Sequence, residues 1–135
     1  MIQVAVRFRV DFGRDGAIGP GKINLLEHIG SGGSLSQAAR ELGMSYRRAW
    51  QLLASLNASF NERVVLSERG GRGGGGAQLT PFGRLLVRVY REFDAELQQR
   101  AARSFAPVAA RARRVAPAPP AARITALSAR PRRRS

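Results

Sequence analysis

Cysteine is absent from the 135-residue sequence, and histidine occurs once. The missing cysteines exclude disulfides, thiolate metal sites and cysteine nucleophiles, and their absence is typical of a reducing compartment. The histidine, His28, is expected on a helix surface or in the core, because no carboxylate pair or metal-ligand spacing accompanies it. We therefore expect neither an enzyme nor a protein with a metal or another cofactor.

Long apolar runs are also missing. No stretch approaches the ~18 consecutive apolar residues of a membrane span, and the N-terminal MIQVAVRFRV alternates instead of forming the apolar centre of a signal peptide. These features predict a cytoplasmic protein that has no membrane partner.

Acidic residues are scarce, with 9 Asp and Glu against 23 Lys and Arg, a net charge of +14. Such a chain suits a polyanion, nucleic acid first. All the acidic residues precede residue 97, and residues 104–135 are rich in Ala, Arg and Pro. We predict a folded domain over 1–103 and a disordered basic tail over 104–135. The tail is either a nonspecific DNA arm that acts through counterion release or a solvated extension without a role.

The first 33 residues predict a strand and a helix. Apolar residues alternate with mostly polar ones over residues 2–12, as in a half-buried β-strand. The glycine-rich residues 13–19 predict a turn or loop, and Pro20 begins a short helix that ends in a cluster of glycines.

Residues 34–56, SLSQAARELGMSYRRAWQLLASL, predict two helices joined by a tight turn. Ser34 and Gln37 form a capping box, in which the hydroxyl accepts from a backbone amide and the Gln side chain reaches back. Gly43 ends the first helix and Ser45 caps the second. This arrangement, with small residues at the expected helix contact, predicts a helix-turn-helix.

The second helix, over about 45–58, is expected to read DNA. At 100° per residue its core-facing side chains are Ala49, Leu52, Leu53, Leu56 and Phe60. Arg47 and Gln51 point the opposite way, where Arg can bridge guanine and Gln adenine in the major groove. Trp50 lies on the flank and is either a packing residue or a groove contact. With Ser36 and Gln37 of the preceding helix, the candidate DNA contacts here are Ser36, Gln37, Ser45, Tyr46, Arg47, Arg48, Trp50 and Gln51.

The stretch GGRGGGGAQLT, residues 70–80, lies between two short strand-like segments, 63–68 and 77–80. A Walker phosphate loop is excluded because no Lys followed by Ser or Thr comes after the last glycine. A linker is disfavoured because structured sequence continues on both sides. We predict the tip of a wing over 69–77, with Arg69 and Arg72 on phosphates or in the minor groove. The alternative is a disordered tip whose arginines contact nothing.

A long helix follows, capped by Thr80 and with Pro81 in its first turn, and it is predicted to run to about residue 103. Its apolar face is broader than a domain of this size needs, and the part from Phe93 onward has no obvious partner in the chain. We expect pairing with the same helix of a second subunit, with burial inside one domain as the alternative. A dimer would present its recognition helices to half-sites roughly 34 Å apart. The predicted dimerisation residues are Leu86, Val89, Tyr90, Phe93 and Leu97.

Residues 1–100 resemble the N-terminal DNA-binding domain of ModE-type molybdenum-responsive transcriptional regulators, which is also similar to that of LysR-type regulators. The resemblance rests on Ala38-Ala39, Gly43-Met44-Ser45-Tyr46, Ala49-Trp50, and the glycine-rich wing followed by Leu79-Thr80-x-x-Gly83. It implies a mainly α fold with a small β component, a winged helix-turn-helix with a long C-terminal dimerisation helix. It also implies a homodimeric, sequence-specific regulator that binds double-stranded DNA.

Full-length regulators of this type carry molybdate-binding β-barrel domains after the long helix. The roughly 35 residues that follow it here are too few for such a domain, so no molybdate site is expected in this chain. A second hypothesis is a winged-helix interaction module that pairs with another regulator and has only nonspecific DNA affinity.

Overall fold

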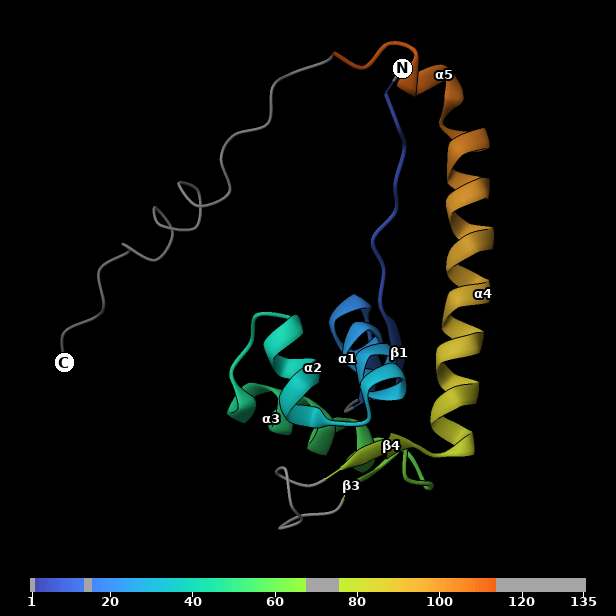
Figure 1. The fold of residues 1–135 in the computed structure, drawn as a ribbon. Helices are drawn as coiled ribbons and strands as arrows, with labels where there is room; N and C mark the ends of the chain where they lie inside the picture. Colours follow the sequence, from blue (N-terminus) through green and yellow to red (C-terminus); the bar gives the residue numbers. More distant parts are fainter. Residues whose placement is uncertain (1, 14–15, 68–75, 114–135) are drawn as a thin grey trace, which may run out of the picture.

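The computed structural model describes residues 2–13, 16–67 and 76–113. It shows the predicted class, a mainly α winged helix-turn-helix. A long helix runs beside and beyond a small, mainly helical part formed by the elements between residues 10 and 79, which we call the head (Figure 1). In chain order the elements are β1 (Val10–Phe12), β2 (Gly16–Ile18), α1 (Pro20–Gly32), α2 (Leu35–Glu41), α3 (Tyr46–Ala58), β3 (Val65–Ser67), β4 (Ala77–Leu79), α4 (Pro81–Ser104) and α5 (Ala106–Ala109).

Helix α1 is the centre of the head. It packs against α2, α3 and α4, and its apolar side chains Ile23, Leu25, Leu26 and Ile29 are fully buried. Removing these side chains from water is the main stabilising contribution to the head. Because α1 contacts the other helices of the head and also α4, it links the two parts of the molecule.

Serine caps begin both helices of the helix-turn-helix, as predicted. Ser34 Oγ accepts from Gln37 N at 3.0 Å, and Ser45 Oγ accepts from Arg48 N at 3.0 Å. The second half of the predicted capping box was wrong, because Gln37 Nε2 donates to Glu41 Oε2 at 2.9 Å instead of reaching back. Glu41 is four residues further along the same helix face, and its carboxylate is a stronger acceptor partner.

The prediction of one strand over residues 2–12 was correct only for its last three residues. β1 pairs antiparallel with β2, Val10 opposite Ile18, and β2 lies within the stretch predicted as a turn or loop. Residues 2–9 are extended with alternating burial, but they run along α4 (Figure 1). β2 ends two residues before Pro20 begins α1, so it is too short to pair with them.

Strands β3 and β4 form the predicted antiparallel base of the wing, with Val65 opposite Leu79. The tip over residues 68–75, which includes Arg69 and Arg72, lies outside the described residues. Asn57, near the end of α3, fixes this base: its Oδ1 accepts from Val64 N at 2.7 Å and from Val65 N at 3.2 Å.

Helix α4 begins as predicted and ends at Ser104. Thr80 Oγ1 accepts from Gly83 N at 2.9 Å and donates to Arg63 O at 2.7 Å, which ties the helix start to the chain just before β3. Pro81 occupies the first turn, where its missing N–H costs nothing. The stretch predicted as a disordered tail starts with the short helix α5, and residues 114–135 lie outside the described residues.

Candidate nucleic-acid interface

The turn between α2 and α3 depends on small side chains. Ala39 and Ala49 are 2% and 0% exposed, so a larger side chain at either position would have to displace its neighbours in the core. Gly43 has φ of +67°, which is strained for residues with a side chain, and Met44 N donates to Ala39 O at 3.0 Å. The spacing recognised in the sequence therefore has the predicted packing role.

Helix α3 is amphipathic in the predicted sense. Ala49, Leu53 and Leu56 are buried, while Leu52 and Phe60 are partly buried against the same core. Arg47 and Gln51 are exposed on the opposite side. Their side chains make no hydrogen bond to any of the described residues, so their donors and the Gln51 acceptor are available to an external ligand.

The two aromatic residues of α3 are coupled to each other. Trp50 Nε1 donates to Tyr46 Oη at 2.8 Å, and the rings meet edge to face with centroids 6.5 Å apart. Trp50 is half-buried against the core, whereas Tyr46 is 47% exposed. The indole N–H is thus already used within the helix, while the Tyr46 hydroxyl proton remains available to a phosphate or base edge.

The remaining candidates border the exposed face of α3. Arg48 and Ser45 are exposed, and the Ser45 hydroxyl is occupied as the cap acceptor. Ser36 and Gln37 are half-buried at the start of α2, and Gln37 is held by Glu41. Of these candidates, Arg48 therefore has the side chain that is exposed and least engaged.

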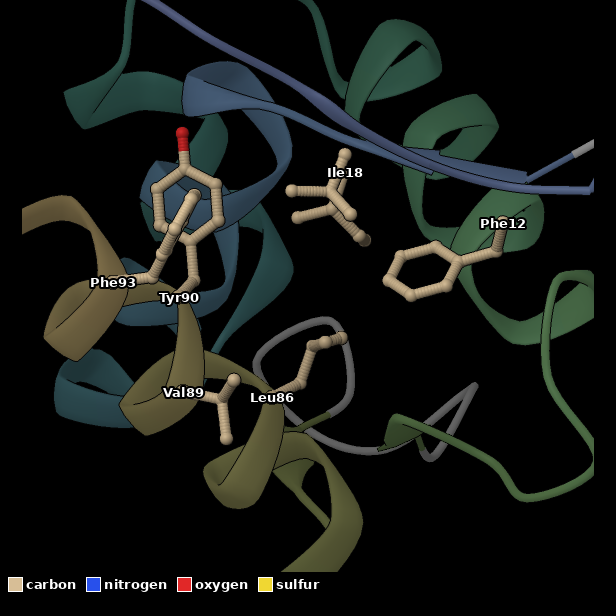
Figure 2. A pocket seen from close by; sticks show the side chains of 7 residues that line it. Phe12, Ile18, Leu86, Val89, Tyr90 and Phe93 are labelled. Carbon is tan, nitrogen blue, oxygen red and sulfur yellow. The ribbon is translucent and has the colours of Figure 1, made fainter. Parts of the chain in front are cut away.

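Four of the five predicted dimerisation residues lie at a separate place, a groove between the β1–β2 hairpin and α4 (Figure 2). The groove measures about 370 Å³ and is lined by Val10, Phe12, Ile18, Leu86, Val89, Tyr90 and Phe93. Val89 and Phe93 are 51% and 44% exposed, and Leu97 is half-buried further along α4. The sequence did not reveal the three hairpin residues, because it gave no sign of β2.

Tyr90, unlike Val89 and Phe93, is buried in the core. It is 6% exposed, its ring stacks on Phe8 with centroids 4.8 Å apart, and its hydroxyl donates to Phe8 O at 3.4 Å. Desolvation by this burial raises the pKa of the Tyr90 hydroxyl, with the nearby Asp94 carboxylate adding to the shift.

The expectation that α4 lacks an intrachain partner from Phe93 onward was wrong. Phe93 packs edge to face on Phe8 with centroids 5.3 Å apart, and Gln98 forms a pair of hydrogen bonds with the backbone of Val6. Ala101 is buried. The N-terminal segment therefore packs on this part of α4, whereas Val89 and Phe93 in the groove stay about half exposed.

Across residues 2–13, 16–67 and 76–113, no three His, Asp or Glu side chains are grouped as metal ligands would be. No helix in those ranges has the length and apolar character needed to cross a membrane.

Residues 21–84 match the bacterial regulatory helix-turn-helix proteins of the lysR family, and this span runs from α1 to the start of α4. This part of the chain is thus a LysR-type helix-turn-helix domain.

Within this class, the N-terminal part of the chain is homologous to ModE and Mop proteins. The "DNA-binding transcriptional dual regulator ModE" of Escherichia coli K12 is 42% identical over 82 residues, which are 61% of this chain and 31% of that protein. The "Molybdenum transport protein ModE" of Azotobacter vinelandii is 37% identical over 100 residues, 71% of this chain and 37% of that protein. The "Molybdenum-pterin-binding protein MopB" of Rhodobacter capsulatus is 43% identical over 83 residues, 61% and 31% of the two chains.

The chain thus spans about a third of the length of these curated relatives. Among solved structures, Streptococcus pneumoniae FabT in complex with DNA is 21% identical, has a TM-score of 0.48, and is matched over 62% of this chain and 59% of that one. That likeness is too distant to assign a function.

Proposed function

We propose that the protein is a homodimeric transcriptional regulator that binds a specific double-stranded DNA sequence by inserting α3 into the major groove. The observation that carries the proposal is the outward face of α3, where Arg47 and Gln51 are exposed and unbonded to described residues. An Arg fork matches guanine N7 and O6, and a Gln amide matches adenine N6 and N7.

The charge of the chain supports the same ligand. The net charge of +14 favours association with the phosphate backbone, and Arg40, Arg47 and Arg48 are exposed on the helix-turn-helix. The wing is proposed to contact the backbone or minor groove next to α3, with Arg69 and Arg72 at its tip. Its described base, β3 and β4, is joined to the end of α3 through Asn57.

Dimerisation is proposed to cover the groove between the hairpin and α4. A wholly apolar groove that leaves Val89 and Phe93 about half exposed is costly in water, and a second copy of α4 offers side chains of the same kind. Two copies would place two α3 helices on one face of the DNA, as an inverted repeat requires.

The test is selection of bound sequences from a random duplex pool by the full chain at physiological salt. We expect an inverted repeat whose half-sites are about one helical turn apart. Recovery of unrelated sequences, with binding that falls steeply as salt rises, would contradict specific recognition. That result would favour the other hypothesis, a winged-helix module that pairs with another regulator and binds DNA only through its charge.

A further inference from the structure

The polar cluster between α1 and α4 centres on Arg91. Its Nη2 and Nε donate to the two carboxylate oxygens of Glu27 at 2.7 and 2.8 Å. This bidentate ion pair fixes the guanidinium plane relative to the carboxylate plane. Nη2 also donates to Asn24 Oδ1 at 3.2 Å, and Nη1 donates to Asp94 Oδ2 at 3.2 Å. All three guanidinium nitrogens are thereby bound, and two of the three partners belong to α1.

The cluster continues to the N-terminal segment. Gln98 Nε2 donates to Asp94 Oδ1 at 2.9 Å and to Val6 O at 2.8 Å, while Gln98 Oε1 accepts from Val6 N at 2.9 Å. Five polar side chains therefore connect α1, α4 and residues 2–9 through directional bonds: Asn24, Glu27, Arg91, Asp94 and Gln98. Apolar packing alone leaves a scatter of about 15–20° in the angle between packed helices, and directional bonds restrict that angle further.

Helix α1 connects the helix-turn-helix, α2 and α3, to α4. It packs on α2, on α3 and on α4 (Figure 1). Next to Glu27, His28 of α1 lies with its Nε2 3.9 Å from Glu41 Oε1 of α2. A rotation at the α1–α4 contact would therefore swing the whole helix-turn-helix relative to α4.

We propose that Arg91 is a positioning residue that fixes the angle between the helix-turn-helix and α4, and thereby the spacing between half-sites that a dimer accepts. This inference rests on the proposed function. Neighbouring spacings differ by about 3.4 Å, the rise of one base pair, so a small rotation of the helix-turn-helix about the α1–α4 contact is enough to change the spacing that fits. The angle must consequently be held tightly if two heads joined through α4 are to discriminate between adjacent spacings.

The test uses the full chain with Arg91→Lys, which keeps the charge but loses the bidentate geometry. Affinity is measured for a single half-site and for a series of inverted repeats whose spacer changes by one base pair at a time. We expect the wild type to favour its best spacer by about tenfold over its neighbours, in line with a mismatch-sized energy difference. In the variant this preference should fall to about twofold, while single half-site affinity stays within about twofold.

Two further variants separate positioning from general damage. Glu27→Gln removes the charged partner on α1 and should broaden the spacer preference as Arg91→Lys does, which keeps the test valid if one variant folds poorly. Arg88→Lys, a substitution of the same kind at an exposed site three residues earlier in α4, should leave the preference unchanged.

The outcomes distinguish a failure of the positioning role of Arg91 from a failure of the proposed function. An unchanged spacer preference in Arg91→Lys and Glu27→Gln would overturn the positioning role while leaving the proposed function intact. Equal losses on single half-sites and on repeats would also overturn it, because they indicate a damaged head. A wild type that selects no half-site at all would instead overturn the proposed function, and this inference with it.

Discussion

At the scale of single residues, α3 separates side chains that hold the fold from side chains that face outward. Ala49 is completely buried, whereas its neighbours Arg47 and Arg48 are exposed. Trp50 belongs partly to both groups, because it packs on the core and bonds to Tyr46. Substitutions on the outward side should therefore change ligand binding without changing stability.

Replacing Arg47 or Gln51 by Ala should weaken binding to the selected operator by ~1–3 kcal/mol each, because each change removes a two-bond contact to a base edge. Affinity for unrelated DNA and the unfolding midpoint should change little. Fluorescence anisotropy titrations on both DNAs would measure this, with Arg88→Ala as a charge-matched control on α4. Operator affinity that is unchanged in both variants would contradict the assignment of α3 as the reading helix.

At the scale of elements, hydrogen bonds from side chains connect segments whose contact the hydrophobic periodicity of the sequence does not predict. Asn57 holds the first residues of the wing strand, and Thr80 ties the start of α4 to the residues before β3. Val64 and Val65 are fully buried, so their backbone N–H groups have no access to water as an alternative acceptor. The wing base therefore depends on one amide side chain of α3.

Asn57→Ala should destabilise the protein by about 1–3 kcal/mol, because it leaves the buried Val64 and Val65 N–H groups without their acceptor. Urea unfolding followed by circular dichroism would give the change in free energy. Asn61→Ala, at an exposed position between α3 and β3, is the matched control and should be within about 0.5 kcal/mol of wild type. Similar values for the two variants would show that the Asn57 bonds contribute little.

The α1–α4 contact predicts a pH dependence. The hydrogen bond from Arg91, reinforced by the charges of Arg91 and His28, lowers the pKa of Glu27 below its ordinary value of 4.5 despite partial burial. A carboxylate whose pKa is lowered by folding adds stability above its unfolded pKa, and that stability is lost as the pH falls through its folded pKa. The pKa of Arg91 is raised by the same bond, out of the range of such an experiment.

We therefore expect wild type to be more stable than Glu27→Gln at neutral pH, with a difference that begins to shrink below about pH 4.5 and vanishes once the folded-state carboxylate is protonated. Thermal unfolding of both proteins across this range would measure it. Glu96→Gln, on the exposed side of α4, serves as the control. A difference that is independent of pH would argue against an ionic contribution from Glu27.

At the scale of the whole molecule, the apolar groove on α4 is the surface through which two copies are proposed to associate. The N-terminal segment packs along part of the helix, and the groove formed with the β1–β2 hairpin leaves the apolar side chains of Val89 and Phe93 about half exposed (Figures 1 and 2). The two-fold pairing proposed for this groove would make DNA affinity depend on protein concentration.

Val89→Glu should give a folded monomer, because Val89 is 51% exposed in the single chain and would carry a charge into the proposed interface. Sedimentation velocity would report the mass, and binding to the full inverted repeat should fall toward that of a single half-site. Gln99→Glu adds the same charge at an exposed position of α4 and should leave the dimer intact. A Val89→Glu protein that sediments as a dimer would place the interface elsewhere.

The sequence alone determined the features that arise from neighbours along the chain. The serine caps, the turn at Gly43, the small contact residues and the inward and outward faces of α3 follow from local bonding and helical period, so they could be predicted. The same reasoning located the start of α4 and the strands at the base of the wing.

Only the tertiary structure decided which distant segments meet. Alternation in residues 2–12 indicated an extended chain but not that α4, 80 or more residues later, would supply its partner through Gln98. The Arg91–Glu27 pair and the hairpin side of the groove were equally hidden, because they join residues far apart in sequence. Local periodicity fixes the direction in which a side chain points, whereas packing of the whole chain decides what it contacts.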